Sequence, residues 1–139
     1  MNSFTFSELK VGLEQSFDVL ITQEKMDMFT LLSGDLNPMH LDPSYARSKG
    51  FENRVVYGML TACFYSTLIG MYIPGKYCLL QGVDTKFIKP VYIGDTLIIT
   101  GRIIYINQSY KQIEIKALIV NQNGVKVSVA SIKSGIVDE

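Results

Sequence analysis

The sequence predicts an α+β fold in which a long antiparallel sheet wraps around one buried central helix. The second half of the chain is a succession of strand-like segments separated by turn residues. Before them lies a segment beginning at Gly58 that is apolar on nearly every side, as expected for a helix in a core. The length of 139 residues predicts one domain, 1–139, which buries enough surface to fold without a disulfide or metal staple.

Five segments have the composition and alternation of strands. They cover 14–20, 77–89, 95–107, 110–121 and 126–137. The breaks at Gln108-Ser109 and Asn123-Gly124 resemble hairpin turns, which favours antiparallel neighbours.

The helical patterns lie before residue 70. Thr22 is a plausible N-cap for a helix that runs to about Ser33, where Gly34 ends it. Residues 35–40 are predicted to form a tight, non-helical corner, because Pro38 disfavours the α region for the residue before it.

A short helix is expected to start at Pro43, run through Ala46 and end near Gly50. Six sulfur-containing side chains are interpreted as core residues. These are Met26, Met28, Met59, Met71, Cys63 and Cys78.

The bulk composition excludes several classes of partner and location. Thirteen basic and thirteen acidic side chains cancel, whereas a nucleic-acid or anionic-membrane surface calls for a basic excess. The first ten residues lack a secretory pattern, and the apolar run 60–73 is too short to span a bilayer, so we expect a cytoplasmic protein. Neither cysteine has a CxxC or histidine-rich context, so no metal or cofactor is predicted.

The corner after the first helix carries the candidate chemistry. Asp35, Asn37 and His40, the only histidine, are three polar side chains on one rigid turn between apolar segments. A carboxylate and an imidazole at this spacing can converge on one water molecule, as general acid–base catalysis by the two groups requires. The alternative is an Asx-type turn in which Asp35 and Asn37 only satisfy backbone groups. The spacing alone does not decide between the two.

A resemblance to a known family favours the first alternative. The run from Phe29 to Ala46, FTLLSGDLNPMHLDPSYA, resembles the hydratase-2 signature of the MaoC-like, (R)-specific enoyl-CoA hydratases. The similarity continues through VVYGML (55–60), Pro74-Gly75 and FIKPVYIGD (87–95), and so covers nearly the whole chain. It implies a hot-dog fold.

The resemblance also implies a role for each residue of the site. Asp35 and His40 correspond to the dyad that holds the attacking water, and Asn37 to the residue that orients the dyad. Gly58 corresponds to the glycine whose N–H receives the thioester carbonyl, and Ser66 to a serine that supports the aspartate. Which dyad member acts as the base stays open, because coupled groups titrate as a unit.

The role of Gly58 also has a physical argument of its own. The first N–H groups of a helix lack intrahelical acceptors, and the positive end of the helix dipole lies there. An enolate-like oxygen would be stabilised at that point. The alternative is that Gly58 only permits close packing.

Two positions depart from the family pattern. Met39 replaces the usual branched aliphatic residue, and Tyr57 stands where many relatives carry histidine. Tyr57 is either a wall of the substrate pocket or plain core packing. Four basic residues are candidates to meet the phosphates of coenzyme A: Lys76, Lys86, Lys89 and Arg54.

The activity implied by the resemblance is the reversible addition of water to a trans-2-enoyl-CoA, giving the (R)-3-hydroxyacyl-CoA, by a hydro-lyase that needs no cofactor. The same chemistry on an acyl carrier protein thioester is an alternative, and so are a hot-dog thioesterase and a non-catalytic acyl-thioester-binding module. A homodimer or higher homo-oligomer is expected, because one sheet wrapped on one helix leaves an edge strand uncovered.

Overall fold

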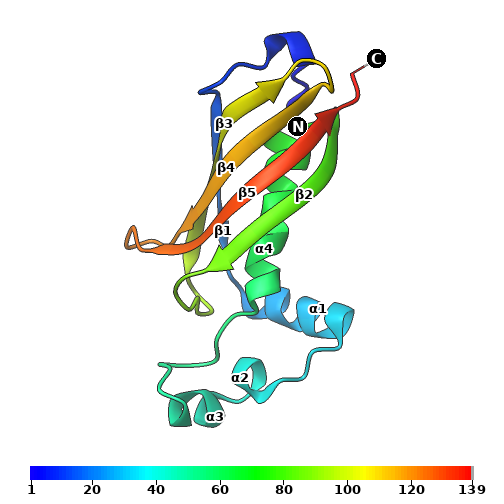
Figure 1. The fold of residues 1–139 in the computed structure, drawn as a ribbon. Coiled ribbons are helices and arrows are strands. Elements are labelled where there is room, and N and C mark those ends of the chain that lie inside the picture. The colour runs from blue at the N-terminus through cyan, green and yellow to red at the C-terminus, as the bar shows by residue number, and fades with distance from the viewer. Residues whose placement is uncertain (139) are drawn as a thin grey trace.

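A computed structural model of the chain, which describes residues 1–138, contains one five-stranded antiparallel sheet in the order β1-β3-β4-β5-β2 (Figure 1). The strands are β1 (Glu14–Leu20), β2 (Cys78–Phe87), β3 (Thr96–Asn107), β4 (Gln112–Val120) and β5 (Lys126–Ile136). All five predicted strands are confirmed, and no end differs by more than two residues, as for 110 against Gln112.

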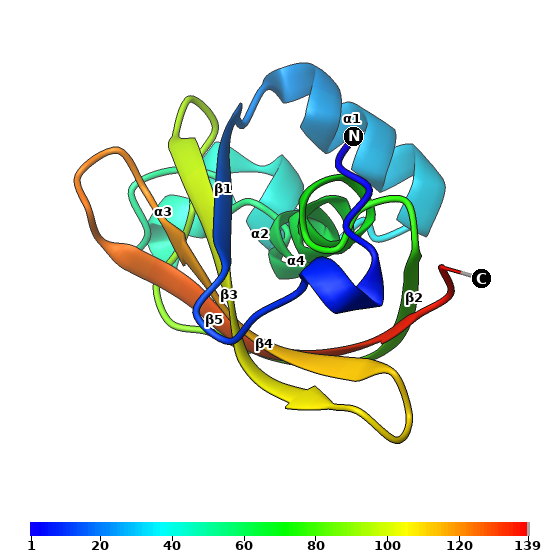
Figure 2. The same ribbon diagram turned by 90° about the horizontal axis from the view of Figure 1, so that it is seen from above.

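Alternating side chains of the sheet build its inner face. In β4 the side chains of Ile113, Ile115, Ala117 and Ile119 are buried, while the residues between them are more exposed. Viewed along α4 (Gly58–Thr67), the sheet curves around this helix from β1 to β2 (Figure 2). The predicted α+β architecture, a sheet wrapped on one central helix, is therefore confirmed.

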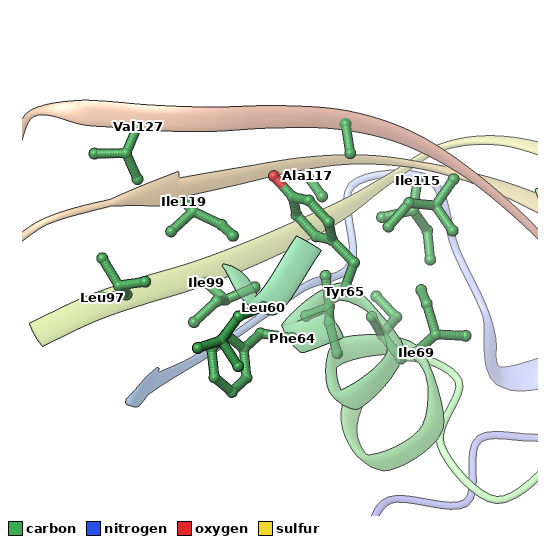
Figure 3. Packing of buried hydrophobic residues seen from close by; sticks show 14 of the residues in the cluster. Leu60, Phe64, Tyr65, Ile69, Leu97, Ile99, Ile115, Ala117, Ile119 and Val127 are labelled. Carbon is green, nitrogen blue, oxygen red and sulfur yellow. The ribbon is translucent and has the colours of Figure 1, made fainter. Parts of the chain in front are cut away.

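The central helix packs one side against the sheet and continues into a π-helical turn, Leu68–Tyr72. Leu60, Phe64 and Tyr65 face the inner side of the strands (Figure 3). The hydroxyl of Tyr65 lies 2.8 Å from Oγ of Ser128 on β5, so the phenol finds a polar partner within the core. Burial raises the pKa of this phenol.

The opposite side of α4 is not covered by the chain. Met59 is 62% exposed, and Cys63 and Ser66 are exposed at the next helical positions of the same face. The prediction of a core position is therefore wrong for Met59 and Cys63, as it is for the exposed Met28 and Met71. Cys78 is partly buried, and Met26 is fully buried as predicted. Hydrophobicity alone does not distinguish a core residue from one on an exposed apolar face.

Three helices gather at the N-terminal end of α4, away from the body of the sheet (Figure 1). They are α1 (Gln23–Ser33), α2 (Pro38–Leu41) and α3 (Pro43–Ser48). The prediction of a non-helical corner over 35–40 is wrong from Pro38 onward, because Pro38 fits the first turn of a helix and Asn37 caps it. The helix predicted from Pro43 is confirmed.

The two ends of the described chain are joined. Near the N-terminus lies a 3₁₀ helix, Phe6–Glu8, whose first N–H donates to a carboxylate oxygen of Asp138 at 2.5 Å. Nζ of Lys111 lies 3.5 Å from the other oxygen. The Phe6 hydrogen bond, with Lys111 adding its charge, holds the pKa of Asp138 below its usual range. No helix within residues 1–138 is both long and apolar enough to cross a membrane.

Candidate active site

The corner between α1 and α2 is built from consecutive side-chain caps. Gly34 ends α1 in the left-handed region, with φ of 70°, and its N–H donates to the Thr30 carbonyl at 2.9 Å. The Asp35 N–H donates to Oγ of Ser33 at 3.2 Å. Asp35 therefore leaves the helix in a defined direction, on a backbone that is tied to the last turn of α1.

Asp35 and Asn37 each accept a backbone hydrogen bond, as in the alternative reading of this turn. Oδ1 of Asp35 accepts the Asn37 N–H at 3.0 Å, and Oδ1 of Asn37 accepts the Met39 N–H at 2.9 Å. Within residues 1–138, the other carboxylate oxygen of Asp35 accepts no hydrogen bond, and the side chain is exposed. Capping occupies only half of this carboxylate and leaves an acceptor facing solvent.

His40 is fixed by the segment that leads into α4. Its Nδ1 lies 2.6 Å from the Val55 carbonyl oxygen. A carbonyl only accepts, so Nδ1 carries the proton in the neutral ring and Nε2 keeps a lone pair. We assign this tautomer from the hydrogen-bond geometry. The imidazole is therefore poised to accept a proton through Nε2.

The backbone around His40 is held as well. Nε of Arg54 donates to the His40 carbonyl at 2.7 Å, and Nη1 donates to Oε1 of Gln23 on α1 at 3.0 Å. The Val55 N–H donates to the Met39 carbonyl at 3.1 Å. Arg54, a candidate for the phosphates of coenzyme A, is thus engaged in joining α2 to α1.

A pocket of about 340 Å³ lies beside His40 at the start of α4. His40, Gly58 and Lys89 line it together with mainly apolar side chains, among them Phe51, Val55, Val56, Thr61, Phe87 and Val127. The N–H of Gly58 donates to no acceptor in the described part of the chain, as expected for the first residue of a helix. The pocket therefore combines a proton acceptor with an unpaired donor in apolar surroundings.

Gly58 also packs closely, which was the alternative reading of this residue. A Cβ at this position would lie 3.2 Å from two ring carbons of Phe87. The two readings are compatible, because the missing side chain brings the helix N-terminus against an aromatic wall of the pocket.

The remaining predicted site residues do not line this pocket. Asp35, Asn37, Tyr57 and Ser66 are absent from its walls. Among residues 1–138, no hydrogen bond joins Asp35 to His40 or to Ser66, which is exposed on α4. The role predicted for Ser66 stays a prediction.

Tyr57 is buried instead, with 1% of its surface exposed. Its ring lies 4.0 Å, centroid to centroid, from that of His40, and its hydroxyl donates to the Asp35 carbonyl at 2.7 Å. The sequence did not predict these contacts or the anchoring of His40 by Val55. Neither has a local signal, since the partners lie 22 and 15 residues apart.

Within residues 1–138, no three His, Cys, Asp or Glu side chains are grouped so that they could hold a metal ion.

Curated relatives match part of the chain. An (R)-specific enoyl-CoA hydratase of Aeromonas caviae is 38% identical over 87 residues, 63% of this chain and 65% of that protein. A mitochondrial 3-hydroxyacyl-[acyl-carrier-protein] dehydratase of Arabidopsis thaliana is 38% identical over 90 residues, 65% of this chain and 53% of that protein. The matched segment thus spans less than two thirds of each of these curated relatives.

Solved structures match over more of the chain. The A. caviae (R)-hydratase involved in PHA biosynthesis has a TM-score of 0.88 at 28% identity, covering 93% of this chain and 98% of that one. An unliganded R-hydratase from Pseudomonas aeruginosa has a TM-score of 0.92 at 27% identity, covering 99% and 88%. Residues 6–123 match the MaoC like domain family, and the chain therefore belongs to this family.

Proposed function

We propose that the protein is an (R)-specific enoyl-CoA hydratase, a hydro-lyase that reversibly adds water to a trans-2-enoyl thioester. The observation that carries the proposal is the pocket at the start of α4, where His40 and Gly58 meet. One supplies an unprotonated Nε2 and the other an unpaired N–H. These are the groups that hydration of an enoyl thioester needs, one for a proton of water and one for the thioester oxygen.

The Gly58 N–H binds the thioester carbonyl in this mechanism. Hydration places negative charge on this oxygen as the β-carbon accepts a hydroxyl group, and the N-terminus of α4 stabilises that charge. The apolar walls exclude water and strengthen the interaction.

The water is held between the open carboxylate oxygen of Asp35 and Nε2 of His40. Its hydroxyl adds to the β-carbon and a proton goes to the α-carbon, so atoms and charge balance without a further reactant. Asn37 supports the pair by capping the helix that carries His40. Because a single water supplies both groups, they add to the same face of the double bond.

Coenzyme A is the proposed carrier of the acyl group. Relatives are named for both CoA and acyl carrier protein substrates. The net charge of zero favours CoA, because an acidic carrier protein would call for a basic rim. Lys89 lines the pocket and is placed to meet the phosphates of CoA. The proposal includes the cytoplasmic location expected from the sequence.

We also propose that two copies of the chain join along β2. This strand is an edge of the sheet, and Val83 in its middle pairs with the buried Ile132. Val83 thus lies in an inward-facing row, yet it is 42% exposed, and Phe87 on the same strand is 51% exposed. An uncovered edge with apolar inner-face residues is typical of a strand that pairs with another chain.

A spectrophotometric assay tests the proposed activity. Loss of the enoyl absorbance is measured with C4 to C12 trans-2-enoyl-CoA substrates, and the product of crotonyl-CoA is resolved on a chiral column. We expect (R)-3-hydroxybutyryl-CoA. An (S) product would contradict the proposal, thiol release without hydration would indicate a thioesterase, and tight binding without turnover would indicate a binding module.

A further inference from the structure

We propose that Tyr57 is a positioning residue that sets the distance between Asp35 and His40. Its hydroxyl donates to the Asp35 carbonyl at 2.7 Å, and its ring lies 4.0 Å from the His40 ring at a tilt of 32°. The inference rests on the proposed function for its consequence in catalysis. The geometry itself stands on these contacts, which connect the two predicted catalytic residues through one buried side chain.

The hydroxyl protons around Tyr57 have one consistent arrangement. Oη of Tyr57 lies 2.7 Å from the Asp35 carbonyl and 2.7 Å from Oγ1 of Thr30. The carbonyl only accepts, so a Tyr57 proton turned elsewhere would leave two acceptors in contact. Tyr57 therefore donates to Asp35, while Oγ1 of Thr30 donates to the Met26 carbonyl at 2.9 Å and lies beside Oη.

These contacts join three segments of the site. Thr30 belongs to the last turn of α1, Asp35 to the corner, and His40 to α2. Tyr57 immediately precedes Gly58, which begins α4 and lines the pocket. One buried side chain thus ties the backbone of Asp35 and the imidazole of His40 to the N-terminus of the central helix.

Asp35 depends on this tie more than His40 does. The imidazole has its own bond to Val55, and its backbone is held by Arg54. Asp35 is exposed, and its other bonds go to Ser33 and Asn37, within the same turn. The Tyr57 hydroxyl is therefore the long-range bond that fixes Asp35 relative to the pocket, and its loss is expected to let the carboxylate drift from His40.

The test is a set of hydroxyl deletions. Tyr57→Phe keeps the ring against His40 and removes only the oxygen. We expect kcat to fall about tenfold with KM changed less than about twofold, since small misplacements of a catalytic group are costly. The double variant Asp35→Asn/Tyr57→Phe should lose no more than about twofold beyond Asp35→Asn, because Tyr57 acts through Asp35.

Tyr65→Phe is the matched control. Tyr65 is also 1% exposed and loses an equivalent buried bond, 2.8 Å to Ser128, but it contacts no predicted catalytic residue. Tyr65→Phe should lose stability as Tyr57→Phe does. Its kcat should stay within about twofold of the parent value, because a loosened core around residue 65 does not misplace Asp35. Equal kinetic effects of the two deletions, or an unchanged kcat in Tyr57→Phe, would overturn the proposal.

A second readout does not depend on activity. His40 is the only histidine, so its imidazole proton resonances are single and assignable by NMR. In the parent chain, Asp35→Asn should shift these resonances at fixed pH, and with Phe at position 57 the shift should shrink by about half or more. An undiminished shift, or none in either background, would refute the positioning role even for a chain that hydrates no thioester. Hydratase activity alone decides the proposed function.

Discussion

The substitution Asp35→Asn separates the capping bond of this carboxylate from its proposed part in catalysis. Its Oδ1 accepts the Asn37 N–H at 3.0 Å, and an asparagine oxygen in the same place accepts the same bond. The change therefore preserves the turn and removes the charge and the basicity of the open oxygen. Because the side chain is exposed, we expect the free energy of unfolding to change by less than about 0.5 kcal/mol.

The effect on turnover should be far larger. A positioned acid or base contributes on the order of a hundredfold or more to a proton transfer. That factor corresponds to about 2.7 kcal/mol of transition-state stabilisation, since each tenfold change is 1.36 kcal/mol. The expected result is thus a loss of at least about a hundredfold in kcat without a comparable loss in stability.

The chain offers a matched control seven residues further on. Oδ1 of Asp42 accepts the N–H groups of Ser44 and Tyr45 at 2.8 and 3.2 Å, in the same kind of cap. Asp42 stands at the N-terminus of α3, where a negative charge contributes about 0.3–1 kcal/mol. Asp42→Asn should therefore cost more stability than Asp35→Asn. Its turnover should stay within about twofold of the parent value, because the change misplaces no group that reacts. This pattern is the opposite of the one expected for Asp35→Asn.

Both variants are measured by the loss of enoyl absorbance with crotonyl-CoA and by thermal unfolding followed with circular dichroism. A kcat above about one tenth of the parent value in Asp35→Asn would refute the assignment of Asp35. A loss in Asp42→Asn as large as that in Asp35→Asn would show that the whole segment, and not the carboxylate of Asp35, limits turnover.

Three further predictions concern the pocket, the terminal tie and the edge strand. Gly58→Ala places a methyl group 3.2 Å from a pocket ring, so kcat/KM should fall, whereas Gly70→Ala meets nothing within 4 Å and should not change it. The pKa of Asp138 is lowered in the folded protein, so its stabilisation is present above the ordinary carboxyl pKa and is lost as the pH falls through the lowered value. The stability difference between the parent chain and Asp138→Asn should therefore shrink on acidification in urea titrations, and a constant difference would contradict this. Val83→Lys on the β2 edge should convert a dimer to a 15.6 kDa species in light scattering, while Ile98→Lys, 40% exposed on β3, should not. A parent chain of 15.6 kDa at micromolar concentration would exclude the dimer.

The strands were predictable from the sequence because their signal is local. Alternation in β4 and the turn at Asn123-Gly124 appear directly in the residue order. The four-residue helix α2 was missed because it is too short to show a period, and the proline that argued against a helix serves as its first residue.

The site was predictable only in part. The residues Asp35, Asn37 and His40 are neighbours in the chain, so their grouping followed from the order of residues alone. The tautomer of His40 depends on a carbonyl 15 residues away, and the Tyr57 bond spans 22 residues, which no local pattern encodes. The exposed side of α4 was mistaken for core, because an exposed apolar face has the same composition as an interior one.

Val55 holds His40 through its backbone and also lines the pocket. The carbonyl that fixes the proton on Nδ1 belongs to the backbone, and so does the N–H that holds the carbonyl of Met39. Val55 also lines the pocket, and its side chain takes no part in either bond. Substitutions at position 55 can therefore change the shape of the pocket, while the backbone carbonyl still holds the proton on Nδ1 of His40. Such a position is a natural place for substrate preference to diverge without loss of the reaction.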